Sequence, residues 1–309
     1  MENSLKQESG KTEELKEVAT LIRDYLMLQK RIAQIESWIE AVKDDGRVHG
    51  KVITNGAVTG RMTHSSPNMA QIPNAGSVYG HECRECWSVE DGNVLVGCDA
   101  SGLELRMLAH YMKDEDYVRT VTEGSSKDGT DVHTVNQRAA GLATRDSAKT
   151  FIYAFLYGAG DAKIGSIVGG TAKDGERLKR KFLQQTPALA KLLERVRKVA
   201  ATGAVPGLDG RRIWVRSEHA ALNSLLQGAG AIVMKKALCI FYDKIKANKW
   251  PVKLVANVHD EFQFECPSDV AEEAGKAARQ SIIDAGIYFN LRCPLDGEYK
   301  SGKSWKETH

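Results

Sequence analysis

The sequence predicts an α+β fold in which strands from distant parts of the chain form one antiparallel sheet. Residues 93–99 (NVLVGCD) are a short, nearly continuous apolar run, which is typical of a buried strand. Residues 252–258 and 262–266 each alternate in polarity, which indicates two further strands joined by a turn. Between these segments, residues 131–203 follow an almost wholly helical pattern. We therefore expect a sheet interrupted along the chain by a helical insertion.

The length and composition indicate an ordinary globular protein. The chain has 309 residues, 42% hydrophobic and 27% charged, which is enough for one large domain or two moderate ones. No run approaches the roughly 18 apolar residues that span a bilayer, and the polar start lacks the apolar core of a signal peptide. We therefore expect a cytoplasmic protein. The formal net charge of +3 permits a nucleic-acid partner without requiring one.

The remaining elements follow from periodicity and turn residues. Apolar residues at three- and four-residue steps predict a long amphipathic helix near the start of the chain, and Asn55-Gly56 predicts a tight hairpin turn between residues 48–53 and 58–63. A second hairpin is expected around Asp209-Gly210. The predicted helices cover residues 14–42, 103–112, 220–249 and 271–285.

Two motifs are weak enough to set aside. His81, Cys83 and Cys86 lie close together, but a structural zinc site normally has four ligands and no second close pair exists. We therefore expect the six cysteines to be reduced thiols. Gly10-Lys11-Thr12 matches the end of a P-loop, but Leu5 stands where the motif needs glycine, so nucleotide binding is not expected there.

Two acidic residues are candidates for metal-dependent chemistry. Asp99 closes the first predicted strand, and Asp260 lies between the two later strands. Phosphoryl transfer to a hydroxyl needs hard carboxylate ligands for cations, and neighbouring strands would bring the two acids together. Spacing alone leaves the structural alternatives open, which are a helix N-cap for Asp99 and a turn residue for Asp260.

A third candidate is the helix expected to begin near Arg145. Arg145, Lys149, Tyr153 and Tyr157 recur at intervals of four, so each step advances about 6 Å and rotates about 40° along one winding stripe. Two cations and a tyrosine in such a row suit a triphosphate followed by its sugar and base. An amphipathic helix with a basic start is the plain alternative.

Together these segments resemble the three polymerase motifs of family A DNA polymerases, in the family's order. The matching segments are DASGLELR at 99–106, RDSAKTFIYAFLYGAG at 145–160 and VHDEF at 258–262. GAVTGRMTHSSPNMAQIPN at 56–74 is similar to the family's segment before the first motif, and the likeness is greatest to replicative polymerases of short-tailed bacteriophages. It extends from about Val18 to the C-terminus.

The resemblance implies a site for two magnesium ions. Asp99 and Asp260 would hold both ions, the carbonyl of Ala100 would assist, and Glu261 would lie nearby as a catalytic residue. Lys149 would protonate the departing pyrophosphate.

The resemblance also implies a binding site for dNTPs. Arg145, Lys149 and His133 would hold the triphosphate, and Tyr153 would lie beside the sugar. Glu104 would pack beneath the sugar as a steric gate against a ribose 2′-hydroxyl. Family polymerases with tyrosine at position 153 tolerate dideoxynucleotides, so the same tolerance is expected here.

Primer-template DNA is the second ligand that the resemblance implies. Arg61, Gln227 and Asn223 would probe the minor-groove edge of the new base pair, where acceptors lie at similar places for every correct pair. Tyr157 would lie near the templating base and His259 near the primer terminus. For Arg61, His133, Asn223 and Gln227, ordinary surface or cap hydrogen bonding is the alternative.

The implied architecture is a right-hand polymerase with an antiparallel palm sheet and helical fingers, but with most of the thumb missing. Residues 1–45 would be a remnant of the thumb, 46–112 and 219–309 the palm, and 113–218 the fingers. Family members carry an exonuclease domain and most of the thumb before this region, so we expect a fragment or one half of a split polymerase.

The implied partners are a separate exonuclease or thumb chain, a processivity factor or a helicase, and no membrane. Two alternatives remain, a catalytically weak DNA-binding or assembly subunit with a palm fold, and an RNA polymerase of the same architecture, which Glu104 opposes.

Overall fold

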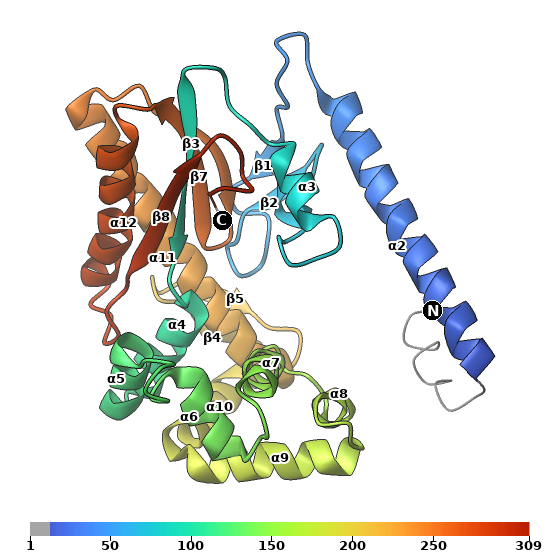
Figure 1. Cartoon of the computed structure of the whole chain (residues 1–309). Helices are drawn as coiled ribbons and strands as arrows, with labels where there is room; N and C mark the ends of the chain where they lie inside the picture. Colours follow the sequence, from blue (N-terminus) through green and yellow to red (C-terminus); the bar gives the residue numbers. More distant parts are fainter. Residues whose placement is uncertain (1–12, 309) are drawn as a thin grey trace. The chain divides into compact units, whose positions relative to one another are not determined.

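The computed structural model describes residues 13–308 and divides the chain into two compact units. The smaller unit comprises Met1–Val52 and His64–Trp87, and the larger comprises Ile53–Thr63 and Ser88–His309. Gly10-Lys11-Thr12 lies outside the described residues. The large unit contains the main sheet and the helices of residues 103–288, which alternate with its strands along the chain (Figure 1).

The smaller unit is built on the predicted long helix, which is confirmed as α2 (Glu13–Ala41). Trp38 of α2 is buried and packs edge-on against Trp87, with the ring centroids 5.4 Å apart. Other apolar side chains of this helix are exposed, including Leu21 at 63% and Ile39 at 67%. The unit also contains the 3-10 turn η1 (Met69–Gln71) and the short helix α3 (Gly80–Glu85).

The main sheet has four antiparallel strands in the order β6-β7-β3-β8. The three predicted strands are confirmed, and the fourth, β8, was not predicted because GEYKSG shows no apolar alternation. The strands are β3 (Asn93–Ala100), β6 (Lys253–Val258), β7 (Glu261–Pro267) and β8 (Gly297–Gly302). The sheet therefore joins residues more than 150 positions apart in the sequence, as β3 pairs with β7.

One face of the sheet packs against two long helices, α11 (Glu218–Asn248) and α12 (Ala271–Tyr288). Phe241 of α11 contacts Phe262 and Phe264 of β7, with ring centroids 5.7 Å and 4.9 Å apart. Both helices are confirmed from the sequence. By length and hydropathy α11 alone among the described helices is apolar enough to cross a membrane, but 56% of its most apolar stretch is buried, so in this fold it is a core helix.

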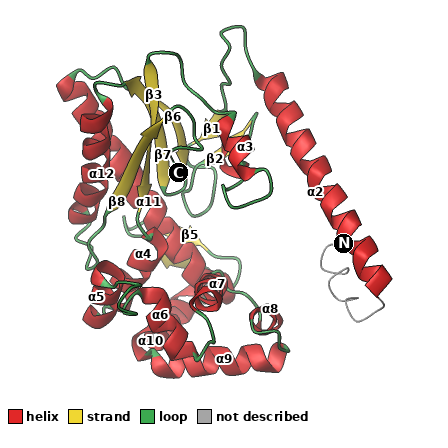
Figure 2. Cartoon of the chain, in the orientation of Figure 1, coloured by secondary structure: helices red, strands yellow, loops and turns green. Residues whose placement is uncertain are grey.

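The helical insertion is also confirmed, and its helices gather beyond one end of the sheet (Figure 2). Phe182 packs edge-on against Phe151 and Phe155, with centroid distances of 5.1 Å and 5.6 Å, and forms the apolar centre of this region. α4 (Leu103–Met112) leads from β3 into this region, whose helices are α5 (Glu115–Glu123), α6 (Val132–Ala140), α7 (Arg145–Leu156), α8 (Asp161–Ile167), α9 (Ala172–Gln185) and α10 (Pro187–Ala200).

Of the two predicted hairpins, one is confirmed and one is wrong in its limits. β4 (Ala204–Pro206) pairs with β5 (Arg212–Trp214) across the Asp209-Gly210 turn. Around Asn55-Gly56, however, the strands are only β1 (Lys51–Ile53) and β2 (Thr63–Ser65). A second turn follows the first, because the amide of Gly60 donates to the carbonyl of Ala57 at 2.8 Å, and residues 54–62 form a loop that carries Arg61.

Candidate functional site

The two candidate acids lie at the ends of neighbouring strands. Asp99 is near the end of β3 and Asp260 is in the turn between β6 and β7. The amide of Ala100 donates to the carbonyl of Asp260 at 2.9 Å, and Asp99 is the register partner of Glu261. Since directly opposed residues point to the same face of a sheet, Asp99 and Glu261 share a face. Among residues 13–308, no group of three or more His, Cys, Asp or Glu residues that could hold a metal ion is found.

Glu261 is buried in a hydrogen-bonded network that the sequence did not predict. Its Oε1 accepts from the indole Nε1 of Trp305 at 2.8 Å and from the side-chain amide of Gln263. Gln263 in turn accepts from the hydroxyl of Thr308 at 2.9 Å. The signal was present in β7, where the residues between the apolar positions are Glu261, Gln263 and Glu265, all buried. A strand with buried polar residues on its second face needs partners there.

Glu104, in the first turn of α4, is held between two donors from distant segments. It accepts from the guanidinium of Arg61 at 3.2 Å, and the hydroxyl of Tyr157 lies 3.0 Å from both of its carboxylate oxygens. The Glu104 side chain is only 14% exposed. Burial and the Glu104 carboxylate raise the pKa of Tyr157 to about 12, because both disfavour the phenolate.

The predicted basic stripe begins at the N-terminus of α7, where Thr144 caps the helix by accepting from the amide of Ser147. Arg145 donates through Nε and Nη2 to one oxygen of Asp131, at 3.0 Å and 2.8 Å. Asp131 also caps α6 by accepting from the amide of His133. The basic stripe alone did not predict Asp131, although a position directly before a helix is typical of an N-cap.

His133 lies close to the stripe, with its ring centroid 6.3 Å from that of Tyr153. Burial lowers the pKa of His133, and the nearby cations of Arg145 and Lys149 lower it further, while Asp131 opposes the shift. The imidazole is therefore neutral near pH 7. Its Nδ1 is buried with no hydrogen-bond partner within the described part of the chain.

Tyr153 connects the stripe to the acids. Burial raises the pKa of Tyr153, and the negative charges of Glu104 and Asp260 raise it further. The C-cap residue of the same helix, Tyr157, contacts Glu104 directly, so the end of α7 lies against the first turn of α4.

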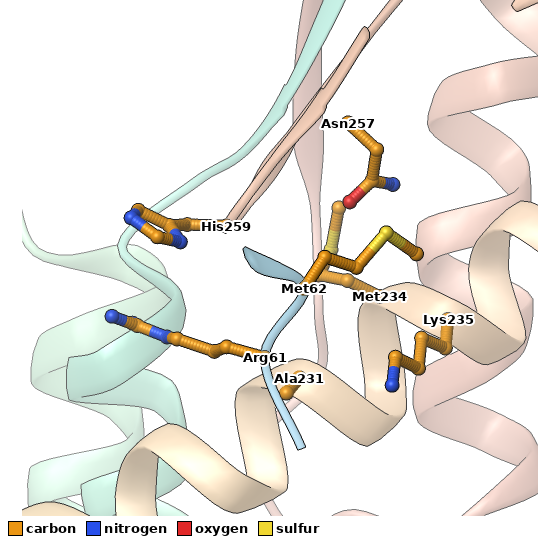
Figure 3. Close-up of a pocket in the computed structure, with 7 residues that line it drawn as sticks. All are labelled: Arg61, Met62, Ala231, Met234, Lys235, Asn257 and His259. Atoms are coloured by element: carbon orange, nitrogen blue, oxygen red, sulfur yellow. The ribbon is translucent and has the colours of Figure 1, made fainter. Parts of the chain in front are cut away.

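A shallow pocket lies between the loop that carries Arg61, helix α11 and the end of β6 (Figure 3). Arg61 and His259 extend to the same side of this pocket, and His259 has a left-handed backbone with φ +59°. Asn223 and Gln227 are half-buried on α11, and the pocket residue Ala231 lies one turn after Gln227. The other residues that line the pocket, which the sequence did not predict, are Met62, Met234, Lys235 and Asn257.

The chain is similar to known proteins over nearly its whole length. The family model described as DNA polymerase family A matches residues 3–307. The DNA-directed DNA polymerases of Enterobacteria phage T3 and Escherichia phage T7 are each 44% identical to this chain, over 94% of the chain and 46% of the relative. DNA polymerase I of Caldicellulosiruptor bescii is 29% identical, over 94% of the chain and 36% of the relative. The chain therefore spans about half the length of the phage relatives.

The fold is also found among solved structures. The POL domain of Pol1 from M. smegmatis, solved in complex with DNA primer-template and dNTP, superposes with a TM-score of 0.87. The two are 23% identical, and the match covers 100% of this chain and 56% of that one. This likeness confirms the α+β polymerase fold that the sequence predicted. Since the family model covers nearly the whole chain, the chain belongs to DNA polymerase family A.

Proposed function

We propose that this chain catalyses DNA-templated transfer of deoxynucleotides from dNTPs to a primer 3′-hydroxyl. The observation that supports this most directly is the pairing of β3 with β7, which sets Asp99, near the end of β3, beside the turn that carries Asp260. The C-cap residue of α7, Tyr157, contacts Glu104, which follows Asp99 by five residues. Acids on a sheet opposite a basic helix suit a reaction between a hydroxyl and a triphosphate.

The acids would hold two Mg²⁺ ions. Asp99 and Asp260 provide carboxylates and Ala100 a backbone carbonyl, which are the hard oxygen ligands that Mg²⁺ prefers. Such sites are usually completed by water and by substrate phosphates, so two protein carboxylates are sufficient. Bound Mg²⁺ would neutralise charge on the reacting phosphate and lower the pKa of the attacking hydroxyl.

The stripe on α7 would bind the triphosphate. Arg145 and Lys149 carry the positive charge, and neutral His133 has a buried ring nitrogen that a ligand can engage. Arg145 uses Nε and Nη2 to bind Asp131, so its orientation is set before the nucleotide arrives. Lys149 is exposed one turn further along α7, where it would donate a proton to the departing pyrophosphate.

Glu104 would act as the sugar gate. Because Arg61 and Tyr157 both hold its carboxylate, Glu104 forms a fixed wall and not a mobile side chain. A ribose 2′-hydroxyl against that wall would meet a rigid obstacle. Replacing Glu104 with alanine is expected to increase ribonucleotide incorporation relative to deoxynucleotide incorporation, and an unchanged ratio would remove this role.

The surrounding residues would position the DNA. Arg61, Asn223 and Gln227 would contact the minor-groove edge of the new pair, His259 the primer terminus and Tyr157 the templating base. Arg61 and His259 support this grouping because they extend to the same side of one pocket. Contacts to minor-groove acceptors sense base-pair geometry without reading sequence.

In this proposal the four-stranded sheet is the palm and residues 113–218 are the fingers. The chain spans 46% of its phage relatives, so we propose that the equivalent of their remaining length supplies tight duplex binding and editing. We propose that a thumb and an exonuclease, in the same protein or in a separate chain, make up that length. A processivity factor or helicase would join at the replication fork, in the cytoplasm of the host.

Primer extension tests the proposal. The chain is incubated with primed DNA, Mg²⁺ and either deoxy- or ribonucleotides, and compared with Asp99→Ala and Asp260→Ala. Loss of either acid is expected to abolish extension while leaving DNA binding in place. Asp91→Ala is the matched control, because Asp91 is exposed in the turn before the same strand. DNA binding without extension by the unaltered chain would instead indicate a non-enzymatic subunit.

Tyr153 offers a narrower test of the nucleotide site. If its phenol replaces the hydrogen bond of a missing 3′-hydroxyl, Tyr153→Phe will lower dideoxynucleotide incorporation without lowering deoxynucleotide incorporation. Equal incorporation of dideoxynucleotides by both proteins would contradict the placement of Tyr153 beside the sugar.

A further inference from the structure

The C-terminal segment, residues 304–308, covers the sheet face that carries Asp99 and Glu261. Trp305 is 3% exposed, and its indole Nε1 donates to Oε1 of Glu261 at 2.8 Å. The hydroxyl of Thr308 donates to Gln263, whose amide donates to the same oxygen of Glu261. Two donors from different elements therefore converge on one carboxylate oxygen.

The segment fits the sheet closely at Gly97 of β3. A Cβ at position 97 would lie 2.5 Å from the carbonyl oxygen of Thr308 and would also collide with the side-chain amide of Gln263. Ser304 forms a bridge with Ser88, which fixes the start of the segment. The segment thus has little freedom to shift along the sheet, and it holds Glu261 in one place.

Glu261 lies next to both candidate metal ligands, Asp260 and Asp99. Glu261 follows Asp260 in the chain and is the register partner of Asp99. The Asp260 carbonyl is bound by Ala100, so the backbone of the turn is fixed on one side by β3 and on the other by the side chain of Glu261. Partners that orient the ligands of a metal site commonly change its affinity when they are removed.

We propose that Trp305 is a positioning residue for the divalent cation site, acting through Glu261 on the orientation of Asp260 and Asp99. The indole N–H keeps the Glu261 carboxylate in place, and the adjoining turn then presents Asp260 beside Asp99. This inference rests on the proposed function, since it concerns the same acids. It assigns a role to a residue far from the three polymerase motifs in the sequence.

The test compares Trp305→Phe with Glu307→Gln. Phenylalanine keeps an aromatic ring but lacks the N–H, whereas Glu307 is an exposed residue of the same segment whose carboxylate accepts from the amide of Lys303. Mn²⁺ binding is measured by electron paramagnetic resonance without DNA, and extension is measured against Mg²⁺ concentration. We expect Trp305→Phe to weaken cation affinity about tenfold, with the KM for dNTPs nearly unchanged, and Glu307→Gln to have no effect.

A double mutant shows whether Trp305 acts through Glu261. In a Glu261→Ala background, Trp305→Phe should add little further loss of cation affinity, because the side chain that the indole positions is gone. Additive losses would overturn the inference. Urea denaturation shows whether each variant is folded. If Trp305→Phe does not fold, Thr308→Val tests the inference instead, and we expect it to lower cation affinity by a smaller amount.

The outcomes separate the two proposals. Unchanged Mn²⁺ affinity and Mg²⁺ dependence in the folded variants would overturn the role of Trp305, while loss of extension in Asp99→Ala would leave the proposed function standing. No Mn²⁺ binding and no extension by the unaltered chain would refute the proposed function itself.

Discussion

The clamp on Glu104 gives a prediction that can be measured without DNA. Tyr157→Phe removes the hydroxyl that lies 3.0 Å from both oxygens of Glu104 and leaves the ring in place. Glu104→Ala removes that contact and also the bond from Arg61 at 3.2 Å. Both changes will lower the free energy of unfolding, and their effects will not add, because both remove the same contact.

The magnitude follows from the exposure of the groups. A hydrogen bond to a charged group contributes about 1.5–3 kcal/mol. Tyr157 is 48% exposed, so water can replace part of its bond, and we expect Tyr157→Phe to cost about 1 kcal/mol. Glu104→Ala should cost about 2 kcal/mol, because the partly exposed Arg61 pair is worth at most about 1 kcal/mol. In the Glu104→Ala background, Tyr157→Phe should cost almost nothing.

Urea denaturation followed by circular dichroism measures these differences as shifts in midpoint at constant slope. Tyr242→Phe is the matched control, because Tyr242 is an exposed tyrosine on α11 whose ring contacts the lysine Lys246. If Tyr157→Phe lowers the free energy of unfolding as much in the Glu104→Ala background as in the unaltered chain, the contact between Tyr157 and Glu104 is refuted.

A titration of the phenol tests the same contact independently. The pKa of Tyr157 is raised to about 12 from 10.0 by burial and by Glu104, so Glu104→Ala should lower it part of the way back. Because the folded pKa is the higher one, this contribution to stability is complete below about pH 10 and is lost as the pH rises through about 12. Ultraviolet absorbance of the unaltered chain minus that of Tyr157→Phe isolates the transition.

Two further predictions concern acid stability and close packing. Burial alone would raise the pKa of Asp131, but hydrogen bonds from Arg145 and Thr134 outweigh it and lower that pKa to about 2 from 3.8. The resulting stabilisation is present above about pH 4 and is lost toward about pH 2. The urea midpoint of Asp131→Asn should therefore depend less on pH in that window than the midpoint of the unaltered chain, and equal dependence would contradict the pairing of Asp131 with Arg145. Gly97→Ala should destabilise the fold by about 1–3 kcal/mol, because the added methyl group collides with Thr308. Gly160→Ala should have a much smaller effect, because a methyl group there meets nothing within 4 Å. Similar urea midpoints for the two variants would contradict the close fit of the C-terminal segment at Gly97.

Most of the fold was predictable because its strands and helices carry strong periodic signals. β3 and β7 each have a buried apolar face, and α11 has long apolar stretches bounded by turns. β8 was missed because GEYKSG has no local apolar pattern, and the contact of Tyr299 with Gly275 of α12 joins distant segments. The limits of β1 and β2 were wrong because a second turn at Gly60 lengthened the loop.

The site residues also divide into those that local spacing predicted and those that it did not. Spacing alone placed Arg145, Lys149 and Tyr153 on one stripe of a helix, and strand ends located Asp99 and Asp260. The partners were not predictable, since Asp131, Trp305 and Gln263 act through tertiary contacts that sequence spacing does not encode. The roles of the site residues remain predictions, while the family and the fold are established by the comparisons.

The antiparallel register of β3 has a consequence for how this chain can vary in length. Cys98 faces the aromatic core opposite Phe262, and Asp99 faces the other way, opposite Glu261. Inserting or deleting one residue within Asn93–Ala100 would exchange these faces and drive a carboxylate in among phenylalanines. Loops between the helices of residues 113–218 have no two-residue alternation of faces. Functional variants should therefore contain insertions and deletions in those loops but not in β3.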